Sequence, residues 1–263
     1  MKRIELIVTC YAGKYPQYAA MFMSQVASLL THPPKTCSVC LTVCHSACDE
    51  MVHDVIDEAE LGMDGDRLDL CRWVFPLNEL FRRGLCRNYA AKKSTADIVW
   101  FADADALWLD GCLDALASSE WERLARPAEA HFHKTHAQGD ADIERNMKWW
   151  KTVKDWSSSR SATKWDEAIP DPSRFQPERI KFASGGYIIV DGDTARKGFL
   201  DGTKWTQPVD PAGGFRDPRE DIAYRKQFKK STPLNLPNLY RFRHSVSTFQ
   251  KAEDRLAQTA KKS

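Results

Sequence analysis

The sequence RGLCRNYAAKKSTADIVWFADADALWLD, from Arg83 to Asp110, decides the fold, because it passes from a basic segment to an apolar run that ends in carboxylates. The run Ile98–Ala102 holds β-branched and aromatic side chains between polar neighbours, a pattern that predicts a buried strand. Asp103 and Asp105 follow directly. Ligands of open α/β sheets bind beyond the carboxyl ends of the strands, so these aspartates stand where a ligand is expected.

Asp103 and Asp105 predict a site for a divalent cation. Two carboxylates this close repel each other unless a cation joins them, and oxygen ligands suit magnesium or manganese. The basic residues just upstream favour a diphosphate beside that cation; they are Arg83, Arg87, Lys92 and Lys93. Two alternatives stay open. The aspartates could cap a helix beginning near Leu109, and the basic residues could form a solvated helix face.

Hydrophobic patterns alternate between strands and helices along the first half of the chain. They predict strands at Ile4–Cys10, Val39–Cys44, Leu68–Phe75 and Asp97–Ala102, and helices at Tyr18–Leu30, Asp49–Glu60 and Leu77–Ser94. This alternation is typical of a parallel, doubly wound sheet.

The second half is less regular. We expect a helix at Asp110–Leu124, no regular period between Arg126 and Arg179, a strand at Phe182–Val190, a flap at Thr203–Arg216 and a helix from Pro218. After Lys230 we expect irregular chain and then a short polar helix.

The order of these motifs resembles that of family-2-like glycosyltransferases with the GT-A fold. RGLCRNYAA followed by ADIVWFADAD is similar to the Arg-Asn-x-x-Ala helix and the Asp-x-Asp strand end of that family. SGGYIIV at Ser184–Val190 and PREDIAYRKQF at Pro218–Phe228 extend the resemblance over most of residues 4–230. It implies an α/β fold of the GT-A type, with a Rossmann-like mixed sheet flanked by helices. We therefore expect one glycosyltransferase domain at 1–230, with a nucleotide-binding half (1–110) and an acceptor half (111–230), and a basic tail at 231–263.

The resemblance also implies an activity, a cofactor and a set of site residues. The activity is inverting transfer of a sugar from a nucleotide-diphospho-sugar, with a UDP-sugar favoured, to a hydroxyl acceptor. Asp221 takes the position of the catalytic base and Glu220 precedes it in the family's Glu-Asp pair. Mn2+ or Mg2+ would be held by Asp103, Asp105 and His244. Donor-binding residues would be Thr9, Cys10, Tyr11, Arg87, Asn88, Asp103, Gly185, Gly186 and Arg243, and Arg241 would be a further cation near the diphosphate.

Plainer explanations exist for several of these residues. Thr9 to Tyr11 could be an ordinary strand-to-helix turn, Glu220 and Asp221 could serve only as acids in the first turn of a helix, and His244 could contact only phosphate or solvent. The sequence also departs from the family after the second strand. The acidic residue that often holds the base there has no close match, and the nearest carboxylates are Asp49 and Glu50.

Bulk properties fit a globular enzyme with a basic tail. The 263 residues carry 38 Lys and Arg against 36 Asp and Glu, but from Arg225 onward basic residues outnumber acidic ones ten to two. The sequence contains no apolar stretch of membrane-spanning length and no signal-peptide pattern. These features predict a cytoplasmic protein, in a bacterium or a phage-infected host, and imply no protein partner.

The eight cysteines are expected to be thiols. Four of them are close in sequence, namely Cys37, Cys40, Cys44 and Cys48, and could be imagined as a zinc or iron–sulfur loop. The sequence SVCLTVC is instead typical of a strand, in which Cys40 and Cys44 share a face away from Cys37. The spacing also lacks a paired CxxC.

The acceptor is suggested by a segment that mixes tryptophans with lysines. Trp149, Trp150, Lys151 and Trp156 are the kinds of side chain that track phosphates and stack on bases or sugars, although the tryptophans could equally pack on the core. This favours a hydroxylated base in DNA, as used by phage-type sugar transferases; a glycan or lipid-linked sugar is the alternative. A non-catalytic nucleic-acid-binding module and a nucleotidyltransferase are the competing classes. His131, His133 and His136 are expected to face solvent or the acceptor rather than a metal.

Overall fold

The computed structural model describes residues 1–63, 65–156, 164–211 and 219–245. Its main sheet has seven strands in the order β10-β6-β9-β4-β1-β2-β3. The four strands β1 (Arg3–Thr9), β2 (Ser38–His45), β3 (Leu68–Val74) and β4 (Ile98–Ala102) are parallel to one another. The parallel half of the sheet is therefore the half predicted from the alternating pattern.

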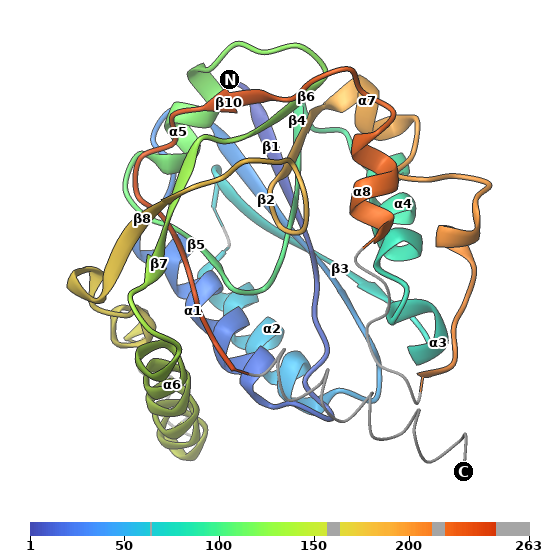
Figure 1. Cartoon of the computed structure of the whole chain (residues 1–263). Coiled ribbons are helices and arrows are strands. Elements are labelled where there is room, and N and C mark those ends of the chain that lie inside the picture. The colour runs from blue at the N-terminus through green and yellow to red at the C-terminus, as the bar shows by residue number, and fades with distance from the viewer. Residues whose placement is uncertain (64, 157–163, 212–218, 246–263) are drawn as a thin grey trace.

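Helices cover both faces of this sheet. Figure 1 shows α1 (Gln17–Thr31) and α2 (Glu50–Gly62) on one side, and α4 (Arg83–Lys93) with α8 (Arg219–Arg225) on the other. Alternate side chains of β4 serve the two layers: Trp100 packs with the α1 and α2 side, while Val99 and Phe101 pack with α4 and α8. Because both faces of the strand are buried, its sequence is continuously apolar.

The rest of the main sheet makes it mixed. β9 (Ile188–Asp191) runs antiparallel to β4 and to β6 (Leu124–Pro127), and β10 (Thr232–Leu234) runs parallel to β6. Short helices accompany these strands: α3 (Leu77–Leu80), α5 (Cys112–Ser118) and α7 (Gly192–Arg196). The predicted mixed α/β sheet flanked by helices is confirmed.

A second sheet brings the end of the described chain back to the aspartates. It has the order β5-β11-β7-β8, with β5 at Ala106–Trp108, β11 at Leu239–Arg241, β7 at Glu129–His133 and β8 at Phe175–Arg179. Between β7 and β8 lie α6 (His136–Trp156) and the 3₁₀ turns η1 (Trp165–Ala168) and η2 (Pro172–Arg174). Arg241 of β11 stands opposite Ala106 of β5, the residue after Asp105.

Three predictions about elements in the second half were wrong. The region 126–179, expected to lack a regular period, contains β7, α6 and β8. In α6 a narrow apolar stripe at four- and three-residue spacing, Ile143, Met147 and Trp150, packs on the protein and the other faces are polar. The chain after Lys230 forms β10 and β11 instead of irregular structure, because three-residue strands exist only when neighbouring strands pair with them.

The boundaries of other predicted elements also change. The expected helix at Leu77–Ser94 is divided at Phe81 and Arg82 into α3 and α4, and the one at Asp110–Leu124 ends at Ser118. The expected strand at Phe182–Val190 begins only at Ile188. The predicted flap at Thr203–Arg216 contains the 3₁₀ turn η3 (Lys204–Thr206), and its end lies outside the described residues, as does the expected C-terminal polar helix.

Candidate active site

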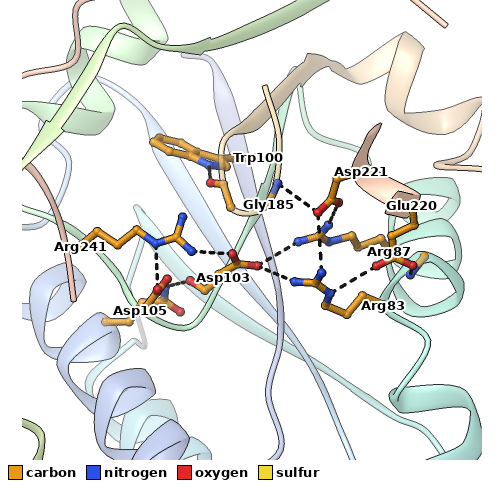
Figure 2. Close-up of polar contacts among 12 residues, drawn as sticks. Arg83, Arg87, Trp100, Asp103, Asp105, Gly185, Glu220, Asp221 and Arg241 are labelled. Atoms are coloured by element: carbon orange, nitrogen blue, oxygen red, sulfur yellow. Dashed lines mark hydrogen bonds and ion pairs between the residues drawn. The ribbon is translucent and has the colours of Figure 1, made fainter. Parts of the chain in front are cut away.

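Four carboxylates and three arginines from distant parts of the chain meet at the carboxyl end of β4. Asp103 and Asp105 follow β4, Arg83 and Arg87 come from α4, Glu220 and Asp221 from α8, and Arg241 from β11 (Figure 2). Figure 2 shows their side chains pointing toward one another, with Asp103 in the middle. The parallel sheet thus gathers these charges where a ligand of an α/β fold is expected.

The backbone of the aspartate turn is held from two sides. On one side the Gln25 amide of α1 donates to the Asp103 carbonyl at 2.8 Å and to the Ala106 carbonyl at 3.0 Å. On the other side Phe242 N–H, just after β11, donates to the Asp105 carbonyl at 3.0 Å. These bonds fix the turn, so the two carboxylates leave the sheet in set directions.

A glycine pair lies directly against this turn. Trp100 of β4 donates from its indole nitrogen to the Gly186 carbonyl at 2.7 Å. A Cβ at Gly186 would lie 2.8 Å from the Asp103 backbone nitrogen, and Gly185 has φ of 59°, a conformation that favours glycine. Both glycines are therefore required for the close approach of this loop to Asp103.

Arg87 links the two acidic motifs. Its Nη1 is 2.5 Å from Asp221 Oδ1 and its Nη2 is 3.3 Å from Asp103 Oδ1, while its side chain is almost fully buried. The other Asp221 oxygen accepts from Gly185 N–H at 3.0 Å. Asp103, Asp221 and the glycine loop thus form one connected unit.

Arg83 and Glu220 support this unit from α4 and α8. Arg83 approaches Asp103 Oδ1 and Glu220 Oε1, each at 3.3 Å, and Glu220 also accepts from Gly84 N–H at 2.9 Å. Burial raises the pKa of Glu220, and the guanidiniums of Arg83 and Arg87 oppose that rise. A buried glutamate at this place holds the start of α4 against α8.

Asp103 is surrounded by positive charge. Burial alone would raise its pKa, but the guanidiniums of Arg241, Arg83 and Arg87 hold the pKa of Asp103 well below its usual value. The carboxylate is therefore ionised at any pH at which the protein would work.

Arg241 joins Asp103 to Asp105. Its Nε donates to Asp105 Oδ2 at 2.8 Å and its Nη2 to Asp103 Oδ2 at 2.7 Å, and its guanidinium lies 4.7 Å from the centre of the Tyr187 ring. Burial alone would lower the pKa of Arg241, but Asp105, Tyr187 and Asp103 raise it well above its usual value. The arginine is a permanent cation between the two carboxylates.

This arrangement does not fit the predicted metal site. Asp105 Oδ1 and His244 Nδ1 are buried and have no hydrogen-bond partner within the described chain, and His244 Nε2 is 3.8 Å from Asp105 Oδ2. However, both Asp103 oxygens and one Asp105 oxygen accept from arginines, and no three Asp, Glu, His or Cys side chains of the described residues are grouped to hold a metal. A cation would have to displace Arg241.

The loop after β1 lies beside the end of β2. Cys10 is buried, the Thr9 hydroxyl is buried, and the Tyr11 ring packs edge-on against Phe81 at 5.0 Å. Asp49, one of the two carboxylates nearest the expected base contact, accepts from Ala12 N–H at 2.5 Å and from Val52 N–H at 3.3 Å. It therefore ties this loop to the start of α2.

Two residues predicted to bind the donor make other contacts. The Asn88 side chain accepts from Phe199 N–H at 3.1 Å and donates to Asp201 at 3.4 Å. Arg243 forms an ion pair with Glu178 of β8 and donates to the Lys134 carbonyl. The structure thus brings Arg241, not Arg243, to the aspartates.

The residues predicted to contact the acceptor are divided. Trp149 and Trp150 pack with Trp165 at ring distances of 6.1–6.4 Å, and Trp150 and Trp165 are buried in the main core. Lys151 is exposed, and the side chain of Trp156 lies outside the described part of the protein. The packing alternative thus describes Trp150.

The predicted histidine and cysteine clusters have separate roles. His133 is buried and bonds to Asp142 at 3.0 Å, His131 stacks on Tyr240, and His136 is exposed. All eight cysteines are free thiols; Cys37, Cys40 and Cys44 are buried and Cys48 is exposed. None of the described helices has the length and apolar character to cross a membrane.

Sequence reasoning did not find Gln25 or the bond made by Asp49. Gln25 could have been noticed because it is a polar residue inside the apolar helix sequence AAMFMSQVASLL. Asp49 precedes a helix and is a typical N-cap, but its bond to the loop after β1 depends on the sheet order.

Comparison with known proteins places this fold. No protein-family model matches the sequence, and no curated protein matches it either. Among solved structures, S. aureus TarS residues 1–349 in complex with UDP aligns over 95% of this chain and 63% of its own, with a TM-score of 0.51 and 11% identity. The mannosyltransferase PcManGT from Pyrobaculum calidifontis, in complex with GDP-Man and Mn2+, aligns over 99% of this chain and 64% of its own (TM-score 0.49, 12% identity). The glycosyltransferase GlyE of Streptococcus pneumoniae TIGR4 aligns over 99% and 50% (TM-score 0.42, 14% identity).

The protein has a GT-A-like fold. The chain spans 63% of the length of the TarS fragment that it matches. The likeness concerns the fold, and the chemistry has to be argued from the residues of this chain.

Proposed function

We propose that the protein is a glycosyltransferase that moves a sugar from a nucleotide-diphospho-sugar to a hydroxyl acceptor. The observation that carries this proposal is the link made by Arg87 between Asp103, at the end of β4, and Asp221, at the start of α8. It brings a strand-end acid and a helix-start acid to one point, with two further arginines beside them. A GT-A-like fold supports the proposal because its sheet presents this point to a ligand.

The donor would bind across the ends of β1 and β4. Thr9, Cys10 and Tyr11 lie on the loop where the base and ribose are expected, and Gly185 and Gly186 line the opposite side at Asp103. Arg83, Arg87 and Arg241 would face the diphosphate, because guanidinium groups donate paired hydrogen bonds to phosphate oxygens. They would also offset the charge that builds on the leaving diphosphate as the sugar–oxygen bond breaks.

Asp221 would act on the acceptor. One of its oxygens bonds to Gly185 N–H, so it lies beside the glycine loop that we assign to the donor sugar. As the acceptor oxygen attacks the sugar carbon from the face opposite the diphosphate, Asp221 takes its proton, and the configuration at that carbon inverts. Glu220 holds Arg83 and the α4 backbone in place for this step. Because Arg241 occupies the position predicted for Mn2+ or Mg2+, no step is assigned to a metal.

The acceptor class is not given by the site itself. A hydroxylated base in DNA and a glycan or lipid-linked sugar would both present a hydroxyl group to Asp221. Salt distinguishes them, because contacts to several DNA phosphates make affinity fall steeply as ionic strength rises. Acceptor binding that is insensitive to salt would count against DNA.

Calorimetric titration of nucleoside diphosphates tests the proposal. UDP, GDP, ADP, CDP and dTDP are titrated separately into the protein, and we expect one of them to bind more tightly than its monophosphate. Arg87→Ala should weaken that binding at least about tenfold, since charged hydrogen bonds contribute about 1.5–3 kcal/mol. Arg72→Ala is the matched control, because Arg72 also pairs with two carboxylates, Asp57 and Glu60, but on the exposed side of β3.

Failure of all five nucleotides to bind would contradict the proposal. Binding of DNA without any nucleotide binding would favour the alternative of a non-catalytic nucleic-acid-binding module.

A further inference from the structure

The cation between Asp103 and Asp105 in this structure is the side chain of Arg241. Its two bonds, at 2.7 and 2.8 Å, reach the carboxylates that the sequence assigns to a divalent metal. A guanidinium and a metal ion cannot share this position, since both would need the same oxygens. The disagreement between the predicted cofactor and the observed contacts concerns the donor site of the proposed glycosyltransferase, and the inference rests on that function.

The backbone fixes Arg241 at this place. β11 pairs with β5 so that Arg241 stands opposite Ala106, and Phe242 N–H bonds to the Asp105 carbonyl. The segment that carries the arginine is therefore bonded to the segment that carries the aspartates. On its open side the guanidinium lies over the Tyr187 ring, at a distance typical of a cation–π contact.

Arg241 keeps the capacity to bind an anion. A guanidinium has five N–H donors, and only two of them are used on the aspartates. Its side chain remains 17% exposed, so a ligand can reach it. Arg83 and Arg87 approach the other oxygen of Asp103, so three guanidiniums surround one carboxylate at the expected position of the diphosphate.

We propose that Arg241 takes the place of a divalent cation in donor binding. Its guanidinium bridges Asp103 and Asp105 and donates its remaining N–H groups to the diphosphate of the nucleotide. The two aspartates orient the arginine instead of coordinating a metal. Nucleoside diphosphate binding is then independent of divalent cations.

The test is a calorimetric titration of the tightest-binding nucleoside diphosphate in excess EDTA and again in Mn2+. We expect dissociation constants that agree within about twofold, because the charge on the diphosphate is met by side chains. Binding that is lost in EDTA and restored by Mn2+ would overturn the role of Arg241 while leaving the proposed function intact. Absence of binding under both conditions would overturn both.

Variants assign the effect to the arginine. In EDTA, Arg241→Ala should bind the diphosphate at least about tenfold more weakly and lose the preference for diphosphate over monophosphate. Arg241→Lys keeps the charge without the planar fork and should fall between the two. Arg72→Ala is the matched control, and thermal unfolding of each variant checks that it is folded. An unchanged preference for diphosphate in a folded Arg241→Ala would overturn the proposal.

Titration with Mn2+ alone, followed by electron paramagnetic resonance, adds a test without nucleotide. We expect no stoichiometric Mn2+ binding to the wild-type protein. A wild-type Mn2+ site that disappears in Asp105→Asn would show that the metal displaces Arg241, and would overturn the proposal.

Discussion

Two clusters in this protein each bury aspartate with arginine and histidine, and they differ in how completely their polar atoms are paired. In the second sheet, Asp142 of α6 accepts from His133 at 3.0 Å and from Arg174 at 2.6 Å. In the candidate active site, Asp105 Oδ1, Glu220 Oε1 and His244 Nδ1 are buried without a hydrogen-bond partner among the described residues.

The difference separates a structural cluster from a binding site. A buried polar atom that lacks a partner costs about 1–3 kcal/mol, so folding alone favours full pairing. The Asp142 cluster meets that requirement and joins α6 to β7 and η2. The cluster around Asp103 does not, and a ligand that supplies the missing partners would complete it.

Substitution of the acid assigned to catalysis should have the largest effect. Asp221→Asn removes the proton acceptor while keeping the shape of the side chain, and the rate of sugar transfer should fall about 10²- to 10⁴-fold. The measurement is release of nucleoside diphosphate from the donor in the presence of acceptor, with thermal unfolding as the check on folding. A folded Asp221→Asn protein with wild-type turnover would remove Asp221 from the reaction.

Stability should respond in the opposite place. Asp142→Ala leaves Arg174 and the buried His133 without their partner, and breaking a buried ion pair from one side costs about 3–5 kcal/mol. Asp105→Asn should cost less than about 1 kcal/mol, because Arg241 keeps its bond to Asp103 and one Asp105 oxygen has no partner to lose. Turnover should nevertheless be abolished in Asp105→Asn.

Urea unfolding of the two variants measures this contrast. Equal losses of unfolding free energy would mean that both clusters are structural, and the argument from unpaired atoms would fail.

The parallel half of the fold was predictable because its signals are local. β4 is continuously apolar, and α1 and α2 end or begin at residues typical of helix boundaries. The strands β5, β10 and β11 have three residues each and were not found, because they exist only through pairing with strands far away in sequence. The 21-residue helix α6 was hidden by its narrow apolar stripe.

The candidate site was predictable in its acids and less so in its cations. Asp103, Asp105, Glu220 and Asp221 belong to short motifs whose order could be recognised, and the structure brings all four together. The partner of the aspartates depends on the register between β11 and β5, which places Arg241 at the site and Arg243 against Glu178. No local pattern distinguishes these two arginines in the sequence YRFRH.

A buried histidine extends the comparison and should give the smallest effect. His133 is paired with Asp142, whereas both ring nitrogens of His45, at the end of β2, are buried without a hydrogen-bond partner in the described residues. Burial, followed by the neighbouring His53, lowers the pKa of His45 to about 4. In the unfolded chain the pKa of histidine is about 6.5, so the unfolded state binds more protons between these values.

Stability should therefore fall as pH decreases from about 6.5 toward 4. From these two pKa values the loss due to His45 is about 1 kcal/mol between pH 7.5 and pH 5.5. His45→Leu should reduce the pH dependence of the unfolding free energy by that amount, and the exposed His136→Gln should leave it unchanged. If His45→Leu keeps the full pH dependence, His45 has a partner in solution, and an unpaired buried nitrogen would no longer distinguish the two clusters.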